Sequence, residues 1–400
     1  MTYTLLFDLD DTLLDTNIES FVPAFFEALS EHMAPHVYPN ITLPALLSAT
    51  RLAMDSEDPS CTLQEVFEGD LYSKIGIAKQ ELIEVIENFY DNVFPNLRTT
   101  TNPLPDAVPL IEWAISQGYR IAIATDPLFP RKATRHRLRW AGLDPEQFEL
   151  ISTAENFHFS KTHLAYYAEV IGQLGWPDGP MLMVGNDMRR DIIPADMLGL
   201  STYFIDNDSA SSPGIEAGRG KLADLRPWLE STDPSALIPS FKSPDAILAV
   251  MSSTPAVLRS MSSSLTEEQW HHEPTSNDWA INEIICHLRD SELEIHKVQL
   301  QLMIEKVGAF IPRPDSSVWA NERNYLDVNG LVALAEFTKA RMQNIEAIRN
   351  LETSIWSRKA RHAIFGPTNF VEVVGFIADH DRAHVQQVWK TLSAIRAERV

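Results

Sequence analysis

The sequence predicts an α/β protein with a doubly wound parallel sheet and a helical insert, followed by an all-α four-helix bundle. In the first half, short and continuously apolar runs alternate with segments of helical periodicity. Strands that are apolar throughout are buried on both faces, as in a parallel sheet covered by helices on each side. After about residue 245 the strand signals vanish, and long segments with helical periodicity remain.

The expected elements follow from these patterns in chain order. In a parallel sheet of this kind, catalytic residues lie at the carboxyl ends of the strands, where Asp8, Thr125 and Asn186 are found. Strands are expected at 2–8, 119–125, 148–152, 180–186 and 201–206, and helices at 18–92 (interrupted at 35–44 and 55–60), 106–117, 131–141, 162–174 and 221–230. The bundle helices are expected at 245–263, 278–307, 329–351 and 368–397.

The chain of 400 residues is long enough for two domains. The α/β domain is expected over 1–230, with the helical insert at about 16–95. The Ser- and Pro-rich stretch at 231–244 is typical of a linker. The bundle then occupies 245–400.

Composition limits the classes of partner. A formal net charge of −22 argues against binding to nucleic acid or to an anionic membrane surface. The sequence contains no apolar run that could span a bilayer and no signal-like amino terminus, and its two cysteines lie far apart. We therefore expect a cytoplasmic protein that acts on a small molecule, with no nucleic-acid or membrane partner and no oligomeric state fixed by the sequence.

The segment LLFDLDDTLLDT at 5–16 ends an apolar run in Asp8, Asp10 and Asp11. Carboxylates beside a core need compensation, so the cluster is either a solvated acidic turn or a site for a divalent cation. Phosphoryl transfer to water uses such residues: a strand-end Asp as nucleophile, a second Asp two residues on as proton donor, and positive charge for the phosphoryl group. Lys161 precedes a helix and can supply that charge.

Four segments in order resemble the motifs of the haloacid dehalogenase (HAD) superfamily: FDLDDT, IAIATD, SKTHLAYY and VGNDMRRDI. The resemblance covers about residues 1–230 and implies a HAD-like Rossmannoid fold with a cap over the site. It implies that Asp8 is the nucleophile, that Asp10 is the acid/base, and that Thr125 and Lys161 hold the phosphoryl group. Mg²⁺ would be held by Asp8, the Asp10 carbonyl and a side chain of the fourth motif.

The fourth motif departs from the family pattern, because Asn186 stands where Asp is usual. Asn186 could ligate Mg²⁺ through its carbonyl oxygen, or Asp187 could take over, and the spacing of Asp187 and Asp191 fits one variant of the motif. Asp10 favours a phosphatase over a dehalogenase, because a halide leaving group needs no proton.

Three histidines in the bundle have the spacing of a metal site. His380 and His384 lie one turn apart on one face of the last helix, and His287 lies on the second helix. Two imidazoles at i and i+4 with a third from a facing helix can hold one metal ion. Asp290, one turn after His287, is expected to orient that ring, and Cys286 is expected in the core.

Residues 243–400 resemble the DinB-like family of metal-binding four-helix bundles. The resemblance rests on Trp279 and His287 in NDWAINEIICHLRDSE, on HAIFGP at 362–367 and on HDRAH at 380–384. The resemblance implies a divalent transition metal (Zn, Ni, Mn or Fe) at His287, His380 and His384. Some members are thiol-dependent transferases or hydrolases.

The leading hypothesis is a Mg²⁺-dependent phosphatase that acts on a small phosphorylated metabolite through an aspartyl-phosphate, fused to a metal-binding DinB-like bundle. The alternative is a catalytically silent module that binds a phosphorylated ligand, with the bundle as a thiol-dependent transferase or hydrolase.

Overall fold

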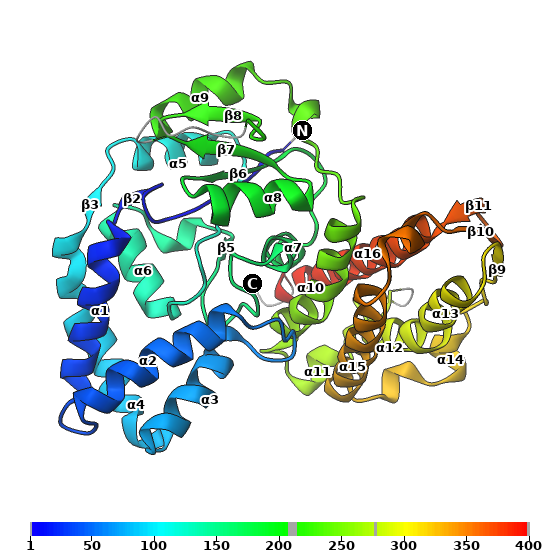
Figure 1. Ribbon diagram of the computed structural model, residues 1–400, viewed down its shortest axis with the longest axis horizontal. Coiled ribbons are helices and arrows are strands. Elements are labelled where there is room, and N and C mark those ends of the chain that lie inside the picture. Colours follow the sequence, from blue (N-terminus) through cyan, green and yellow to red (C-terminus); the bar gives the residue numbers. More distant parts are fainter. Residues whose placement is uncertain (1, 207–213, 276–277, 398–400) are drawn as a thin grey trace. The chain divides into compact units, whose positions relative to one another are not determined.

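The computed structural model describes residues 2–206, 214–275 and 278–397 (Figure 1). The chain divides into two compact units, Met1–Val170 with Asp178–Ser240, and Ile171–Pro177 with Phe241–Val400. Residues 207–213 of the expected α/β domain and 276–277 and 398–400 of the expected bundle lie outside the described residues. Among the helices that the structure describes, none is both long and apolar enough to cross a membrane.

The first unit is built on a six-stranded sheet in the order β5-β4-β1-β6-β7-β8, and all five neighbouring pairs are parallel. This confirms the predicted doubly wound fold. β8 was not expected, because its sequence GRG carries no apolar residue. The strands are β1 Thr4–Phe7, β4 Arg120–Ile123, β5 Leu150–Ile151, β6 Met181–Gly185, β7 Ser201–Ile205 and β8 Gly218–Gly220, and the helices of this layer are α5 Ala107–Ser116, α6 Arg131–Trp140, α7 Leu164–Gln173, α8 Ile193–Leu198 and α9 Leu222–Ser231.

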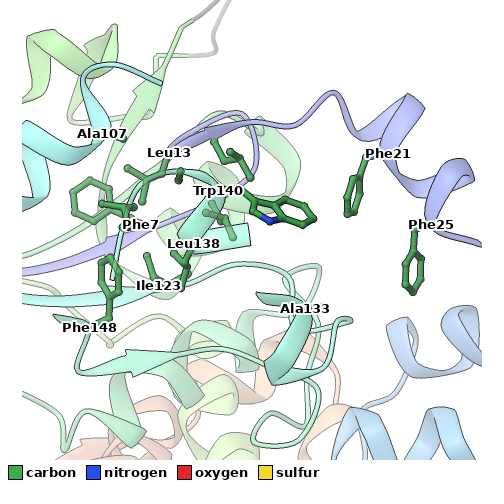
Figure 2. Packing of buried hydrophobic residues seen from close by; sticks show 14 of the residues in the cluster. Phe7, Leu13, Phe21, Phe25, Ala107, Ile123, Ala133, Leu138, Trp140 and Phe148 are labelled. Carbon is green, nitrogen blue, oxygen red and sulfur yellow. The ribbon is translucent and has the colours of Figure 1, made fainter. Parts of the chain in front are cut away.

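The strand register decides where the candidate site forms. Phe7 in β1 lies opposite Ile123 in β4 and Val184 in β6. The residues that follow these three strands therefore meet at one edge of the sheet. Beneath this edge, Phe7 and Ile123 pack with Leu138 of α6 in a fully buried apolar layer (Figure 2).

The insert forms a helical cap, as the sequence predicted, with two differences at its breaks. The break expected at 35–44 is shorter, because Pro39 occupies the first turn of α2, where its missing N–H costs nothing. A further break follows α3, because Gly76 ends that helix with φ of 70°. The cap helices are α1 Ile18–Met33, α2 Pro39–Met54, α3 Leu63–Ile75 and α4 Lys79–Asn88, followed by short turns at Phe89–Val93 and Phe94–Thr100, and the two-stranded sheet β2 Leu14–Asp15 with β3 Asn102–Pro103 lies at its base.

The second unit contains the four long helical segments that the sequence predicted. It also carries a three-stranded sheet, in the order β11-β10-β9, that was not expected because its strands are short and partly polar. The long segments are α10 Pro244–Ser262, α12 Ile281–Ser291 continuing through a π-helical turn Glu292–His296 into α13 Lys297–Glu305, α15 Gly330–Arg349 and α16 Phe370–Ala397. The shorter elements are α11 Glu267–Trp270, α14 Trp319–Glu322, β9 Ala309–Ile311, β10 Lys359–His362 and β11 Gly366–Asn369.

A buried ionic network joins the four helical segments of the bundle. Arg341 of α15 is fully buried and pairs with Asp381 of α16 and with Glu292 of the π-helical turn, which are both fully buried as well. Thr254 of α10 donates to Asp381 over 3.1 Å, and Asn344 of α15 donates to Glu292 over 2.7 Å. A buried charge without such partners would cost several kcal/mol, so the network fixes how these helices pack.

Candidate functional sites

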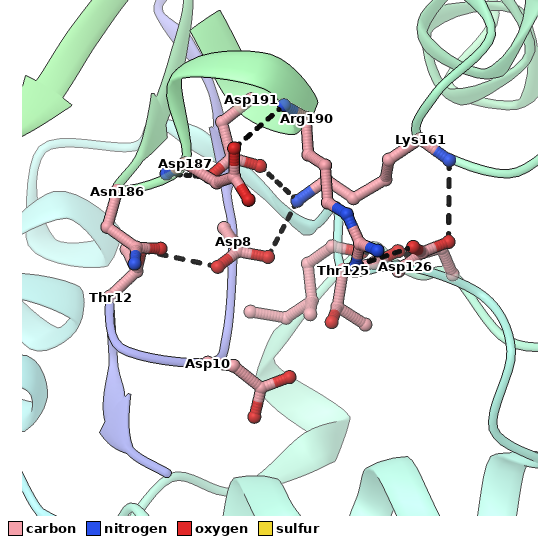
Figure 3. Close-up of polar contacts among 12 residues, drawn as sticks. Asp8, Asp10, Thr12, Thr125, Asp126, Lys161, Asn186, Asp187, Arg190 and Asp191 are labelled. Carbon is pink, nitrogen blue, oxygen red and sulfur yellow. Dashed lines mark hydrogen bonds and ion pairs between the residues drawn. The ribbon is translucent and has the colours of Figure 1, made fainter. Parts of the chain in front are cut away.

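Asp8 lies at the centre of a polar cluster at the carboxyl edge of the sheet (Figure 3). Its backbone N–H donates to the Val184 carbonyl over 2.9 Å, which continues the sheet register by one residue. Lys161 Nζ lies 2.6 Å from Asp8 Oδ1 and also pairs with Asp191, and Thr12 Oγ1 donates to Asp8 Oδ2 over 3.3 Å. Lys161 therefore bridges two carboxylates, one from the first motif and one from the fourth.

The charges of this cluster are shifted by burial and by one another. Burial raises the pKa of Asp8 to about 8, with Lys161 opposing the shift and Asp191 and Asp10 adding to it. Burial opposes the charged form of Lys161, but the carboxylates of Asp191 and Asp8 raise its pKa well above the usual value. Lys161 is therefore a stable cation beside the candidate nucleophile.

The three acidic residues of the first motif have separate environments. Asp10 accepts a hydrogen bond from Thr16 Oγ1 at 2.6 Å and pairs with Arg137, and its carboxylate points away from Asp8 (Figure 3). Asp11 has φ of 56° and accepts from the backbone N–H groups of Thr16 and Asn17, so it stabilises the turn. A half-buried acidic turn and the polar cluster of Asp8 thus coexist within four residues.

Arg137 is a residue of this site that the sequence analysis missed. It is fully buried in α6, and its guanidinium lies 5.4 Å from the Phe21 ring of α1 and 4.9 Å from the Phe129 ring. Apart from the ion pair with Asp10, its Nε and Nη1 find no hydrogen-bond partner among the described residues. The charge is offset by one carboxylate and two aromatic faces.

Thr125 follows β4 and is buried. Hydrogen bonds to the Thr125 carbonyl hold the backbone in place after this strand. That carbonyl accepts hydrogen bonds from Ser152 Oγ at 2.6 Å and from Tyr166 Oη at 2.8 Å. The next residue, Asp126, accepts from Arg190 Nη1 at 3.2 Å and from the Lys161 backbone N–H at 3.4 Å. Arg190 was also missed by the sequence analysis, because the sequence does not show which of the two arginines in the fourth motif faces the site.

The three candidate ligands of the fourth motif, Asn186, Asp187 and Asp191, have different hydrogen-bond partners. Asn186 Oδ1 accepts from Thr12 Oγ1 at 3.2 Å, so it faces the same hydroxyl as Asp8. Asp187 Oδ1 accepts from the backbone N–H groups of Arg189 and Arg190 and caps the turn Met188–Ile192. Asp191 pairs with Lys161 and accepts from the Asp187 backbone N–H at 2.9 Å. Asn186 is therefore the residue of this motif that is turned toward Asp8.

The oxygen atoms around Thr12 fit a magnesium ion in their chemistry. Asp8 Oδ2 and Asn186 Oδ1 both lie within 3.3 Å of the Thr12 hydroxyl, so a carboxylate and an amide oxygen converge there. Mg²⁺ prefers such oxygen ligands and keeps several waters.

The three bundle histidines meet in the second unit. One ring nitrogen from each of His287, His380 and His384 lies within 4.8 Å of the other two. His287 Nε2 is 3.2 Å from His380 Nε2. Two imidazole nitrogens bound to one ion at about 2.1 Å lie roughly 3.0 to 3.4 Å apart for angles between about 90° and 109°, so the observed separation fits a shared metal. Trp279 stacks on His384 with an interplanar angle of 6°.

The protonation of these rings also suits metal binding. Burial lowers the pKa of His287 to about 3, and the neighbouring His384 and His296 rings add to the effect. Burial likewise lowers the pKa values of His380 and His384. All three rings are neutral near pH 7 and offer a lone pair, which is the state that a metal ligand requires.

Asp290 does not have the expected role toward His287. Its carboxylate accepts from Tyr325 Oη at 2.6 Å, Arg323 Nη1 at 2.6 Å and Arg289 Nε at 2.7 Å. His287 Nδ1 has no hydrogen-bond partner among the described residues. The spacing prediction for Asp290 was therefore wrong, because these three donors hold its carboxylate.

His296 lies beside the trio and was missed. Its ring centroid is 5.3 Å from that of His380, and its Nδ1 is 3.0 Å from Glu292 Oε2. In a regular α-helix, nine residues separate two side chains by about 180°, so His296 would face away from His287. The π-helical turn widens the helix and changes that angle.

Comparison with known proteins gives two family matches in separate parts of the chain. Residues 3–199 match the family model of haloacid dehalogenase-like hydrolases, and residues 251–388 match that of the DinB superfamily. No curated protein matches the sequence.

Among solved structures, a HAD phosphatase from Thermococcus onnurineus is 21% identical with a TM-score of 0.39, covering 57% of this chain and 98% of that chain. A 2-haloacid dehalogenase from Pseudomonas syringae pv. Tomato DC3000 is 20% identical with a TM-score of 0.42, covering 57% and 99%. YfiT from Bacillus subtilis, described as a probable metal-dependent hydrolase with an unusual four-helix bundle topology, is 17% identical with a TM-score of 0.35, covering 38% and 87%. The chain thus joins a region at 3–199 that matches the haloacid dehalogenase-like hydrolase model to a region at 251–388 that matches the DinB superfamily model.

Proposed function

We propose that the first unit is a Mg²⁺-dependent phosphatase that cleaves a phosphate monoester of a small metabolite through an aspartyl-phosphate on Asp8. The observation that carries this proposal is Lys161 Nζ at 2.6 Å from Asp8 Oδ1, with a second carboxylate, Asp10, two residues along the chain. The lysine offsets the repulsion between a carboxylate nucleophile and a phosphate, and Asp10 supplies a proton.

In the first step, an Asp8 oxygen attacks phosphorus and the bond between phosphorus and the ester oxygen breaks. The carboxylic acid of Asp10 gives its proton to that oxygen, which leaves as an alcohol. In the second step, the Asp10 carboxylate takes a proton from a water that attacks phosphorus, and Asp8 is released with inorganic phosphate. Asp10 is bound to Thr16 and Arg137 in this structure, so its carboxyl must turn toward the substrate before the first step.

The other residues of the site hold the phosphoryl group and its counter-charges. Thr125, two residues after β4, would donate its hydroxyl proton to a phosphoryl oxygen, and Lys161 would neutralise part of the charge. Mg²⁺, held by Asp8, the Asp10 carbonyl and Asn186, would supply the remaining positive charge. Asp187 is the less favoured ligand because its carboxylate caps a helix, and Asp191 acts by positioning Lys161.

Asp10 favours phosphate over halide release. A carbon–halogen bond breaks without protonation of the leaving group, so a dehalogenase gains nothing from an acid at this position. A phosphate monoester releases an alkoxide, whose departure depends on a proton.

The test is phosphate release from a panel of phosphate monoesters with Mg²⁺, compared for the native protein, Asp8→Asn and Asp11→Asn. Asp11 is the matched control, because its carboxylate binds backbone N–H groups and an Asn oxygen can accept the same bonds. We expect release by the native protein and Asp11→Asn and none by Asp8→Asn. Chloride release from 2-chloroacids in place of phosphate release would refute the phosphatase assignment, and neither product would favour the silent binding module.

For the second unit, we propose a divalent transition metal at His287, His380 and His384. The 3.2 Å separation of two ring nitrogens supports a shared ion, and the neutral state of the rings supports their role as ligands. A Lewis-acid ion with open positions would suit activation of a water or a thiol.

The bundle is tested by Co²⁺ absorption and by metal content of the purified protein. His384→Gln should lower the affinity for Co²⁺ by at least tenfold, whereas His271→Gln, on a half-buried ring that contacts the Glu267 carbonyl, should leave it unchanged. Equal Co²⁺ affinity in both variants would remove the metal assignment.

A further inference from the structure

The cap encloses a cavity of ≈ 610 Å³ that opens onto the catalytic edge of the sheet. Its walls come from α1, α2 and α3, with Ile86 and Tyr90 from the end of the cap and the segment after β4. Asp10, Asp126 and Arg190 also line it. The proposed proton donor therefore lies at the boundary between the phosphoryl site and this cavity, and the volume is in the range of small-molecule pockets.

Most of the side chains that line the cavity are apolar. Phe25 and Phe26 of α1, Leu46 of α2, and Phe67 and Leu71 of α3 form its walls. Four of these five are buried, and Phe67 is half-buried. Contact with these apolar side chains stabilises a ligand that carries hydrocarbon and does not compensate a polyol for its lost hydration.

Three of the polar side chains in the cavity wall are engaged with the protein, those of Thr50, Gln64 and Glu68. Glu68 pairs with Lys79 over 2.6 Å and accepts from Gln64 Nε2 at 2.8 Å. Thr50 Oγ1 donates to the Leu46 carbonyl over 2.9 Å. These groups are therefore poorly placed to bind sugar hydroxyls.

Arg190 is the one cation among the residues that line the cavity, and it pairs with Asp126 at the mouth. Among the residues that the structure describes, no lysine lines the cavity, so a second phosphate or a carboxylate on the substrate would lie among apolar groups and near Asp10 and Asp126. The lining thus disfavours bisphosphates and nucleotides.

Hydrogen bonds fix the cap walls to the segment that carries Lys161. The Met54 carbonyl at the end of α2 accepts from Ser160 Oγ at 2.8 Å, and His163 Nε2 lies 3.1 Å from the same carbonyl. The Leu63 N–H at the start of α3 donates to the Phe157 carbonyl over 2.8 Å. The cavity is therefore a built part of the site and has a set position relative to the lysine.

We propose that the substrate is a monophosphate ester of an apolar alcohol, aromatic or aliphatic, whose hydrocarbon body fills this cavity. The proposal rests on the phosphatase function above and names its substrate class. The phosphoryl group binds at Asp8 and Lys161, the ester oxygen lies next to Asp10, and the body extends between α1, α2 and α3.

The experiment measures kcat/KM for methyl, propyl, butyl, hexyl and phenyl phosphate, with glucose 6-phosphate and glycerol phosphate as polar counterparts. Burial of one methylene group corresponds to a factor of about four, so kcat/KM should rise by roughly that factor per methylene until the cavity is full. Glucose 6-phosphate should be a poorer substrate than hexyl phosphate by at least tenfold.

Two variants test whether this dependence comes from the cavity. Phe67→Asn, on its wall, should flatten the dependence of kcat/KM on chain length. Leu47→Asn is the matched control, because Leu47 lies on the same cap helix α2 as Leu46 but is 50% exposed and does not line the cavity. It should leave the dependence unchanged, and equal slopes in both variants would overturn the proposal.

Calorimetric binding of methylphosphonate and hexylphosphonate, which cannot be hydrolysed as esters, separates this proposal from the phosphatase function. Tighter binding of hexylphosphonate with no phosphate release from any ester would support the apolar cavity and refute the phosphatase. Phosphate release with no preference for hexyl over methyl phosphate, or with preference for the sugar phosphate, would overturn the substrate class and leave the phosphatase standing.

Discussion

Replacing Arg341 with methionine should strongly destabilise the bundle. The guanidinium is fully buried, and it is the cation between two fully buried carboxylates, Glu292 and Asp381. The pKa of Glu292 reflects both the burial and the ion pair. Burial opposes the charge on Glu292, but Arg341 and His296 hold its pKa well below the usual range. Methionine fills much of the same volume, so the main effect is the loss of charge.

The expected loss is about 3 to 5 kcal/mol in the free energy of unfolding, because two carboxylates stay buried with reduced compensation. For a unit of this size, each kcal/mol lowers the unfolding midpoint by roughly 2 to 4 °C. The midpoint of the bundle should therefore fall by about 6 to 20 °C. A triple variant gives a second check: replacing Arg341, Glu292 and Asp381 together by Met, Leu and Leu should recover most of the loss.

The assay is urea and thermal unfolding followed by circular dichroism in a chelating buffer, so that bound metal does not contribute. The control is Arg226→Met, because Arg226 is 55% exposed and pairs with Glu230 one turn away on α9. Its expected effect is below about 1 kcal/mol. A loss below 1 kcal/mol for Arg341→Met, or a triple variant no more stable than the single one, would refute the reasoning.

Three further predictions concern the first unit. The apparent affinity for Mg²⁺ should fall by about tenfold per pH unit below pH 8, because the pKa of Asp8 is about 8 in the metal-free protein and the ion must displace a proton; calorimetry at pH 6, 7 and 8 checks this, and an affinity independent of pH would contradict it. In the metal-free protein, Asp8 should lower the free energy of unfolding as pH rises from about 4 to 8, because its raised pKa means that the folded state binds the proton more tightly than the unfolded chain; this part of the slope should be absent in Asp8→Asn. Gly185→Ala should cost about 1 to 3 kcal/mol and abolish phosphate release, because a Cβ there would collide with the Asp191 carboxylate that holds Lys161, whereas Gly69→Ala, with open space around it in α3, should stabilise by about 0.5 to 1 kcal/mol.

The sequence predicted the strands that form the site because their signal is local. β1, β4 and β6 are apolar apart from Thr4 and Arg120 at their first positions, and a polar residue follows each strand within two positions. Their meeting at one edge therefore follows from the parallel sheet alone. β8 carries no such signal, since Gly218 and Gly220 join the sheet only through backbone pairing with β7.

Residues that act through distant partners could not be predicted in the same way. Arg137 and Arg341 look like ordinary helical arginines in the sequence, and their burial depends on carboxylates 127 and 40 positions away, respectively, Asp10 and Asp381. His296 was missed because a regular helix would point it away from His287, and the π-helical turn is not readable from composition. Asp290 was assigned by spacing, but three donors compete for its carboxylate.

The position of Arg137 has a consequence for how the cap and the chemistry influence each other. Its guanidinium contacts the proposed proton donor Asp10 on one side and the Phe21 ring of cap helix α1 on the other. A movement of α1 that removes this ring changes the electrostatic field at Asp10 and therefore the free energy of its charged form. By linkage, the charge of Asp10 changes the free energy of that movement by the same amount. The position of α1 and the charge of Asp10 are therefore thermodynamically linked through one buried cation.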